Sequence, residues 1–280
     1  MRDCLKQLNN LGNAVCVGLD PDLTKTPSEF DILNQEESIL EFLEQIVAVT
    51  SEYAAAFKIQ KAFLDLYAGP SLLERLIERI HKISNKPVIV DCKIGDIDNT
   101  MNAYLKNIFD RANADAIIIN PYMGGDVINS TKRYSDRGIF VLVKTSNPSA
   151  GMIQNLMILP RNNNDTVKPL WKYLLSELIC RFNDYRNIMP VLSYDSNLRD
   201  IRRLLPEDMS LLYAGVGIQG GNLDGIEYLF NSKKGGVIVN SSRHILYPYL
   251  RSDKNWRDKV LLTTRDLHEE IVKIRNNDRK

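Results

Sequence analysis

Short apolar runs recur eight times along this chain, and amphipathic helical patterns separate most of them. The runs are bounded by polar, glycine or proline residues, and they are shorter than a typical helix, so they predict buried strands. The predicted strands are Ala14–Leu19, Ala54–Ile59, Pro87–Val90, Ala116–Asn120, Gly138–Lys144, Met189–Ser193, Ser210–Gly215 and Gly236–Asn240.

The intervening helical patterns place apolar residues three and four positions apart, which is the spacing of an amphipathic helix. They cover Glu36–Tyr53, Ser71–His81, Val167–Tyr185 and Trp256–Ile274. Strands this apolar, alternating with helices, predict a parallel sheet that is buried on both faces. Eight such units predict an α/β fold, a closed (β/α)8 TIM barrel. A doubly wound open sheet is the alternative.

Length and composition agree with one barrel domain over residues 1–280. Apolar residues make up 44% and charged residues 25% of the chain, which is typical of globular proteins. The net charge is +1. Charge therefore gives no reason to expect nucleic acid or an anionic membrane as a partner.

The cysteines and the N-terminus indicate the compartment. The four cysteines (Cys4, Cys16, Cys92 and Cys180) are widely spaced and form no metal or redox motif, so reduced thiols are expected. No apolar stretch approaches the roughly twenty residues of a membrane span. The first thirteen residues are polar and lack the apolar core of a signal peptide. We expect a cytoplasmic protein.

Charged residues gather after the third predicted strand, at Asp91, Lys93 and Asp96. Residues two apart on a strand point to the same side, so Asp91 and Lys93 are expected on one face. Asp96 follows where the strand should give way to a loop. Lys58, near the end of the second strand, should face the same carboxylates. In a barrel, the carboxyl ends of the strands form the active site.

Such an alternating charge network favours a particular chemistry. At about 4 Å and an effective dielectric near 20, each opposite pair contributes about 4 kcal/mol before desolvation, which keeps the lysines protonated and the aspartates ionised. A Schiff base needs a neutral amine, so the network suits it poorly. It suits the stabilisation and protonation of a carbanion. A purely structural ion network at the barrel mouth is the alternative.

The last two strands predict a phosphate site. The seventh runs into the glycine-rich stretch Gly215–Gly221, and the eighth ends at Ser242 and Arg243. Loops after these strands commonly bind phosphate in barrels. The glycines let the backbone approach an anion, and Arg243 supplies a forked cationic donor.

These residues resemble the orotidine 5′-monophosphate decarboxylase family. Its hallmark, Asp-x-Lys-x-x-Asp-Ile-x-x-Thr, is matched by Asp91, Lys93, Asp96, Ile97 and Thr100. Further segments are similar to the family's in the same order: Gly18–Pro21, Phe57–Gln60, Thr145–Pro148, Gly215–Gly221 and Ser242–Arg243. The pattern is most similar to the longer-chain branch found in some bacteria and in apicomplexan parasites.

The resemblance implies a cofactor-free, metal-free barrel that converts orotidine 5′-monophosphate (OMP) to uridine 5′-monophosphate (UMP) and carbon dioxide in de novo pyrimidine biosynthesis. Asp91 would lie against the substrate carboxylate, and Lys93 would protonate carbon 6 of the pyrimidine. Lys58 would hold Asp91 and contact the ribose. Asp20 would bind a ribose hydroxyl.

The resemblance also implies a homodimer with shared active sites. Asp96 and Thr100 would reach into the partner's site, and Ile97 would form an apolar wall there. Asp98 departs from the family's frequent glycine, but Asp tolerates a positive φ better than most residues.

The remaining implied contacts concern the two ends of the substrate. Ser146 would bond the amide edge of the pyrimidine. Gln219 and Arg243 would hold the phosphate, and the loop 217–225 would close over it. Ser242 stands where the shorter-chain branch has glycine, and it keeps its backbone N–H for the same site.

Other readings of these residues stay open. A keto-sugar-phosphate decarboxylase of the same superfamily would need a divalent metal, which the two lysines would repel. A Schiff-base aldolase would use Lys144 at the end of the fifth strand. A non-catalytic phosphate-binding barrel would bind a nucleotide without turnover.

Overall fold

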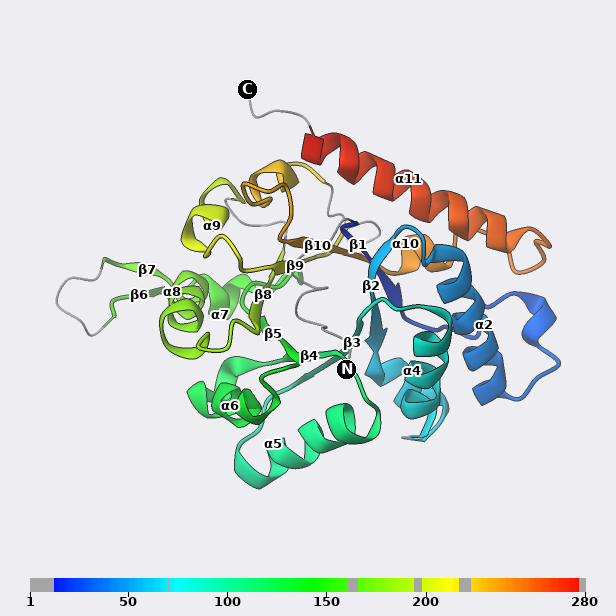
Figure 1. Ribbon diagram of the computed structural model, residues 1–280, viewed down its shortest axis with the longest axis horizontal. Coiled ribbons are helices and arrows are strands. Elements are labelled where there is room, and N and C mark those ends of the chain that lie inside the picture. Colours follow the sequence, from blue (N-terminus) through cyan, green and yellow to red (C-terminus); the bar gives the residue numbers. More distant parts are fainter. Residues whose placement is uncertain (1–12, 70, 161–165, 194–197, 217–222, 277–280) are drawn as a thin grey trace.

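Eight parallel strands close into a barrel in the computed structural model, which describes residues 13–69, 71–160, 166–193, 198–216 and 223–276 (Figure 1). In order around the barrel, the strands are β1 (Val15–Leu19), β10 (Val237–Ser241), β9 (Leu211–Ala214), β8 (Ile188–Ser193), β5 (Gly138–Leu142), β4 (Ala116–Ile119), β3 (Val88–Ile94) and β2 (Ala54–Gln60). The predicted (β/α)8 barrel is confirmed, and each predicted strand overlaps one of these.

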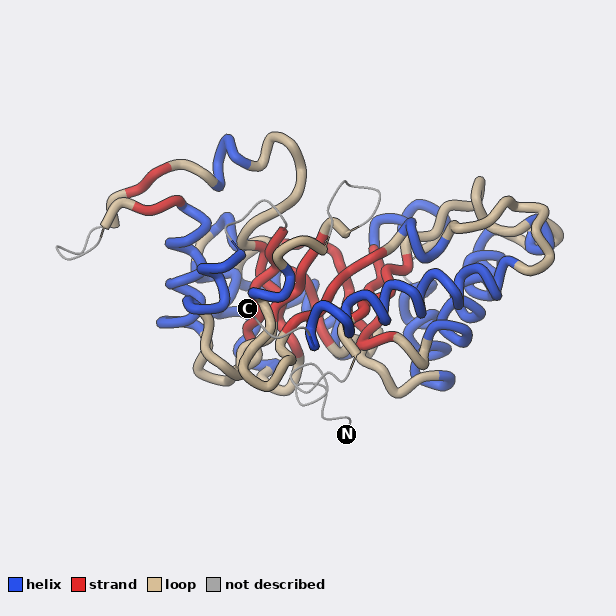
Figure 2. The backbone as a smooth tube through the Cα atoms, turned by 90° about the horizontal axis from the view of Figure 1, so that it is seen from above, coloured by secondary structure: helices blue, strands red, loops and turns tan. Residues whose placement is uncertain are grey.

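Most of the helices cover the outside of the barrel, as Figures 1 and 2 show, whereas the short α7 (Gly151–Gln154) lies in the segment after β5 that extends away from it. The helices are α2 (Gln35–Thr50), α3 (Lys61–Tyr67), α4 (Ser71–Ile83), α5 (Asp98–Leu105), α6 (Gly125–Asn129), α7, α8 (Leu170–Glu177), α9 (Leu198–Leu204), α10 (Arg243–Leu246) and α11 (Trp256–Asn276). Wider π-helical turns continue α5 over Lys106–Arg111 and α8 over Leu178–Phe182. None of the helices in the described residues combines the length and apolar character that a membrane span requires.

The barrel interior holds its own apolar cluster, separate from the larger core between the strands and the helices. Its members come from all eight strands: Cys16, Ala56, Ile89, Ala116, Ile118, Phe140, Met189, Val191, Leu212 and Ile238. Side chains alternate along a strand, so residues two or four positions further on also point inward. At the carboxyl ends most of these positions are polar, and they form the mouth of the barrel.

An arm interrupts the barrel repeat after β5. Two short strands, β6 (Met157–Ile158) and β7 (Lys168–Pro169), pair antiparallel and extend away from the barrel (Figure 2). Strands of two residues carry no periodic pattern, so the sequence did not predict them. Residues 161–165, between these two strands, lie outside the described residues.

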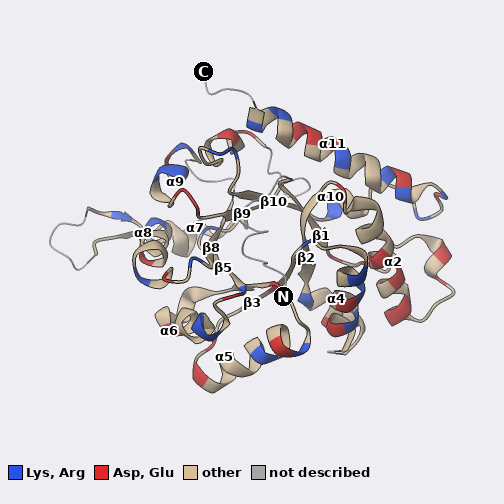
Figure 3. Ribbon diagram, in the orientation of Figure 1, with Lys and Arg blue, Asp and Glu red and all other residues tan. Residues whose placement is uncertain are grey.

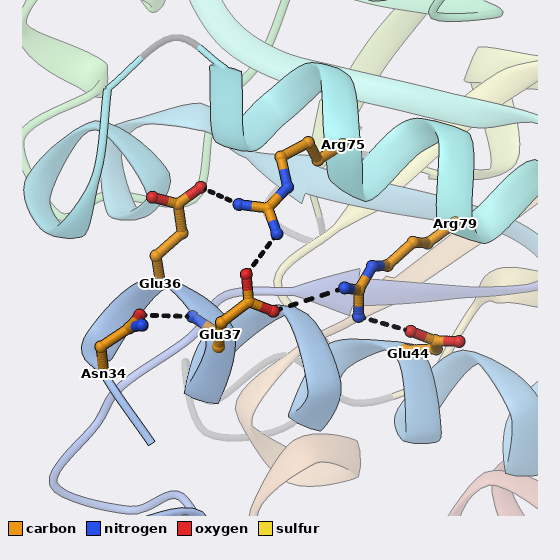
Figure 4. A network of polar contacts seen from close by, with 6 residues as sticks. All are labelled: Asn34, Glu36, Glu37, Glu44, Arg75 and Arg79. Atoms are coloured by element: carbon orange, nitrogen blue, oxygen red, sulfur yellow. Dashed lines mark hydrogen bonds and ion pairs between the residues drawn. The ribbon is translucent and has the colours of Figure 1, made fainter.

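The outer helices carry charges of both signs, interspersed along α4 and α11 in Figure 3. A network of ion pairs joins α2 to α4 (Figure 4). Arg75 of α4 contacts Glu36 and Glu37 of α2, and Arg79 Nη1 lies 2.8 Å from Glu44 Oε2. Such partly exposed pairs each add little stability, so the network serves mainly to align two neighbouring helices.

Candidate active site

A cavity of about 880 Å³ opens at the carboxyl ends of the strands and is lined from all eight of them. The sequence-predicted residues that line it are Asp20, Lys58, Asp91, Lys93, Ser146, Ser242 and Arg243. Gln219 and most of the loop 217–225 lie outside the described residues. Among the described residues, those expected to contact the ribose, the pyrimidine and the phosphate therefore line one cavity.

Four side chains form a line of alternating charge in this cavity. Lys58 Nζ lies 3.0 Å from Asp91 Oδ2 and 3.9 Å from Asp20 Oδ1. Lys93 Nζ lies 2.7 Å from Asp91 Oδ1. The side chains of Lys58 and Asp91 are each 6% exposed, whereas that of Lys93 is 44% exposed. Lys93 is therefore the most exposed member of the line, and it lines the cavity.

The inner part of the line is held in its charged form. Burial by itself would raise the pKa of Asp91, but Lys58 and Lys93 outweigh it and lower the pKa below the usual 3.8. Burial would lower the pKa of Lys58, but Asp20 and Asp91 outweigh it and raise the pKa above 10.5. Beneath them, burial raises the pKa of the Cys16 thiol to about 12, so it stays neutral.

The backbone of β3 departs from the simple alternation that the sequence predicted. The register against β4 shifts between Asp91 and Ile94, and Lys93 has a φ of 46°. A positive φ is uncommon for a residue with a long side chain, and such strain costs on the order of 1 kcal/mol. The two side chains still meet despite this irregularity. Asp98 has a φ of 47°. This positive φ is the conformation expected at a position where the family frequently has glycine.

Asp96, Ile97 and Thr100 do not line the cavity of their own chain. Asp96 Oδ1 accepts a hydrogen bond of 2.8 Å from the Ile97 N–H, Ile97 is 37% exposed, and Thr100 is exposed in the first turn of α5. The expectation that Asp96 faces Lys58 and Lys93 within one chain is therefore wrong. The chain turns away after Lys93 to begin α5. Asp20, which directly follows β1, lies at the other end of the charge line, beside Lys58.

Ser242 and Arg243 meet the cavity where β10 passes into α10. Gly18 of β1 lies directly against Ser242: a Cβ atom on Gly18 would lie 1.9 Å from Ser242 Oγ. Because Gly18 has no side chain, there is room for Ser242. The shorter-chain branch has glycine at the position of Ser242.

The wall beside Ser146 comes from the segment that leads into the arm. Gln154 Oε1 accepts a bond of 3.0 Å from the Thr145 N–H, and Gln154 Nε2 donates to Thr145 Oγ1 at 2.8 Å. Lys144, which is 1% exposed, donates from Nζ to Asn155 Oδ1 at 2.6 Å. Sequence reasoning missed Gln154 and Asn155 because it searched only the strand ends, and these residues follow about ten positions later.

Two acceptors in the cavity lack a donor. Asp20 Oδ1 and Asn240 Oδ1 are buried and receive no hydrogen bond from the described residues. Buried polar atoms are normally satisfied, so both are suited to donors on a ligand. Within the part of the chain that the structure describes, no three His, Cys, Asp or Glu side chains gather into a group that could hold a metal ion.

Comparison with known proteins shows the family of this chain. Residues 13–248 match the family described as "Orotidine 5'-phosphate decarboxylase / HUMPS family". A Bordetella avium protein named orotidine 5'-phosphate decarboxylase is 31% identical over 263 residues, which cover 92% of this chain and 93% of that protein.

Solved structures show the same relationship. The structure of Leishmania donovani OMP decarboxylase is 27% identical with a TM-score of 0.78, and the match covers 97% of this chain and 99% of that one. Leishmania donovani UMP synthase matches with the same identity and TM-score, but there this chain spans 55% of the longer protein. These matches confirm the resemblance inferred from the sequence, and the chain belongs to the orotidine 5'-phosphate decarboxylase / HUMPS family.

Proposed function

We propose that this protein is an orotidine 5′-monophosphate decarboxylase of de novo pyrimidine biosynthesis, acting as a single barrel domain over residues 1–280. The observation that carries the proposal is the line Asp20–Lys58–Asp91–Lys93, which ends in an ammonium exposed to the cavity. Family membership supports the reaction, and the charge line supports the roles of individual residues.

In the proposed reaction, Lys93 is the proton donor. The bond between carbon 6 and the carboxyl carbon breaks, carbon dioxide leaves, and the electron pair stays on carbon 6. A fixed ammonium at that carbon stabilises the developing negative charge more than it stabilises the ground state. The Lys93 proton then passes to carbon 6, which gives UMP.

Asp91 and Lys58 prepare this step. Asp91 accepts a hydrogen bond from each lysine, at 2.7 Å from Lys93 and 3.0 Å from Lys58, so it fixes the ammonium of Lys93 relative to the barrel. We place the substrate carboxylate beside Asp91. Donors and charges that are fixed before the substrate binds need no reorganisation during the reaction.

The rest of the cavity is proposed to bind the nucleotide. Asp20, with its unsatisfied Oδ1, and Lys58 would bind the ribose, and Ser146 the amide edge of the pyrimidine. Arg243 would bind the phosphate with the backbone of Ser242 and with Gln219. The phosphate lies away from the bond that breaks, so its binding energy can close the loop 217–225 over the site.

We further propose a homodimer with shared sites. Asp96, Ile97 and Thr100 lie outside their own cavity, at the start of α5. The same region exposes apolar side chains: Tyr104 on α5 is 43% exposed and Leu66 on α3 is 69% exposed. A second hollow of about 350 Å³ lies between these helices, with Tyr104 in its wall. A partner subunit that covers this surface would bring Asp96 and Thr100 into its own active site.

We propose a cytoplasmic location. Among the described residues, Cys16, Cys92 and Cys180 are free thiols, which is typical of a reducing compartment.

The Schiff-base alternative is disfavoured by the surroundings of Lys144. Its Nζ is buried and donates to Asn155 Oδ1 at 2.6 Å, so the amine is not placed for attack on a carbonyl. Borohydride trapping of substrate on Lys144 would support that alternative. Lys58 and Lys93, which flank Asp91, likewise disfavour a divalent metal at that carboxylate.

The direct test is to follow OMP absorbance with purified protein, with and without excess chelator. The proposal predicts conversion to UMP at the same rate in both samples. Absence of conversion would refute the activity. Conversion that chelator abolishes would indicate a metal-dependent decarboxylase.

A further inference from the structure

Tyr247 is bonded to the backbone on both sides of Asp20. Its hydroxyl donates to the Asp20 carbonyl oxygen at 3.0 Å and accepts from the Asp22 N–H at 2.7 Å. The phenol thus bridges the turn through Pro21, immediately after β1. Burial raises the pKa of Tyr247, so the hydroxyl keeps the proton that it donates.

Tyr247 also belongs to the segment that carries the predicted phosphate ligand. It directly follows α10, which begins at Arg243, and its N–H bonds the Arg243 carbonyl oxygen at 3.2 Å. Its ring stacks on Phe42 of α2, with the ring centroids 6.0 Å apart. One residue therefore connects the turn that holds Asp20 to the helix that begins with Arg243.

Further bonds fasten the same two segments together. Arg251 Nε donates to the Thr26 carbonyl oxygen at 2.7 Å, and the Ser28 N–H donates to the Arg251 carbonyl oxygen at 2.9 Å. These bonds lie further from the cavity. The bond from the Tyr247 hydroxyl, by contrast, reaches Asp20 itself.

The position of Asp20 matters because its Oδ1 is buried without a donor from the described residues and lies 3.9 Å from Lys58 Nζ. The carboxylate can bond a ligand hydroxyl only if its backbone holds it at the cavity wall. A displacement of about 1 Å is enough to weaken such a contact severely.

We propose that Tyr247 is a positioning residue that sets Asp20 for recognition of the ribose hydroxyls. The inference rests on the proposed function, because it takes a ribonucleotide as the ligand. The contacts described for Tyr247 are all with other residues of the protein, so it would act on the substrate through Asp20.

Tyr247→Phe tests this, because the variant keeps the ring and its stacking and removes only the hydroxyl. Tyr249→Phe is the matched control: Tyr249 packs against Tyr247, and its buried hydroxyl has no partner among the described residues. Calorimetric titration would compare UMP with 2′,3′-dideoxyuridine 5′-monophosphate, which lacks the hydroxyls.

Tyr247→Phe should lower the affinity for UMP by about tenfold and change the affinity for the dideoxynucleotide by less than about twofold. Only UMP has the hydroxyls that Asp20 would bind. In an Asp20→Ala background, Tyr247→Phe should have no further effect on UMP. Tyr249→Phe should leave both affinities unchanged. Equal weakening of both nucleotides, or an additive effect in the double variant, would overturn the proposal.

Hydrogen exchange of the Asp22 amide gives a second readout that needs no nucleotide. Tyr247→Phe should speed exchange in peptides that contain Asp22, and Tyr249→Phe should not. Unchanged exchange in Tyr247→Phe would refute the positioning role. If exchange responds as expected but the wild-type protein binds no UMP, the proposed function fails and the structural role of Tyr247 stands.

Discussion

Lys93 Nζ lies 2.7 Å from Asp91 Oδ1, although a register shift and a φ of 46° at Lys93 interrupt the strand between them. A regular strand would also place these side chains on one face. The Lys93 side chain remains 44% exposed and lines the cavity, while Asp91 stays buried. Strain of this kind concentrates at functional sites.

Replacing Asp91 by Asn should destabilise the protein in a pH-dependent way. The folded-state pKa of Asp91 is lowered below 3.8, so its stabilising effect is present above that pH and is lost as the pH falls through the folded value. At pH 7 the variant should lose about 3 kcal/mol of free energy of unfolding. The difference should shrink below pH 3.8.

Denaturant unfolding of wild type and Asp91→Asn across this pH range checks the prediction. Asp184→Asn, at an exposed turn, is the control and should change little at any pH. A difference that stays constant from pH 7 to low pH would show that the ionised carboxylate is not what stabilises the fold.

Gly18→Ala should disturb the phosphate end of the site through Ser242. The added Cβ would lie 1.9 Å from Ser242 Oγ and 2.7 Å from Ser242 Cβ, so the serine must move. We expect UMP affinity to fall about tenfold or more. The double variant Gly18→Ala, Ser242→Gly removes both clashing atoms and should recover most of the affinity. If the double variant binds as weakly as Gly18→Ala alone, this steric explanation is wrong.

Arg243→Ala should weaken phosphate-bearing ligands selectively. The guanidinium can donate two hydrogen bonds to one phosphate, and charge-assisted bonds of this kind contribute about 1.5–3 kcal/mol each. UMP should therefore lose at least about tenfold in affinity, while uridine binding stays the same. Arg265→Ala on α11, remote from the cavity, is the matched control. Equal losses for UMP and uridine would exclude a phosphate role.

Mixing two inactive variants tests the shared site. In a dimer of Lys93→Ala with Asp96→Ala, one site carries both changes and the other carries neither. Random mixing makes about half of the dimers mixed, so about one quarter of wild-type activity should return. Native mass spectrometry would verify that mixed dimers form. Verified mixed dimers without activity would mean that Asp96 serves its own subunit.

The barrel could be predicted because each strand is a continuous apolar run, and burial on both faces leaves that pattern in the sequence. Helices such as α2 and α4 were recognisable from their apolar stripe. The arm was not, because β6 and β7 are two residues long and pair only with each other. Short local pairs leave no periodicity to detect.

The site was predictable where residues sit at strand ends. Lys58, Asp91 and Asp20 lie close together because alternation aims them into one mouth. The left-handed backbone at Lys93 was not predictable, since lysine has no preference for it. Tyr247 escaped notice for a different reason: its hydroxyl acts on backbone atoms more than two hundred positions away in the sequence.

Lys93→Ala tests the role of Lys93 most directly, with OMP turnover and UMP affinity measured on the same preparation. We expect rapid turnover by the wild type, loss of turnover in the variant by several orders of magnitude, and UMP affinity that stays within about tenfold of the wild-type value. Substantial residual turnover by a correctly folded Lys93→Ala protein would contradict the claim that Lys93 donates the proton.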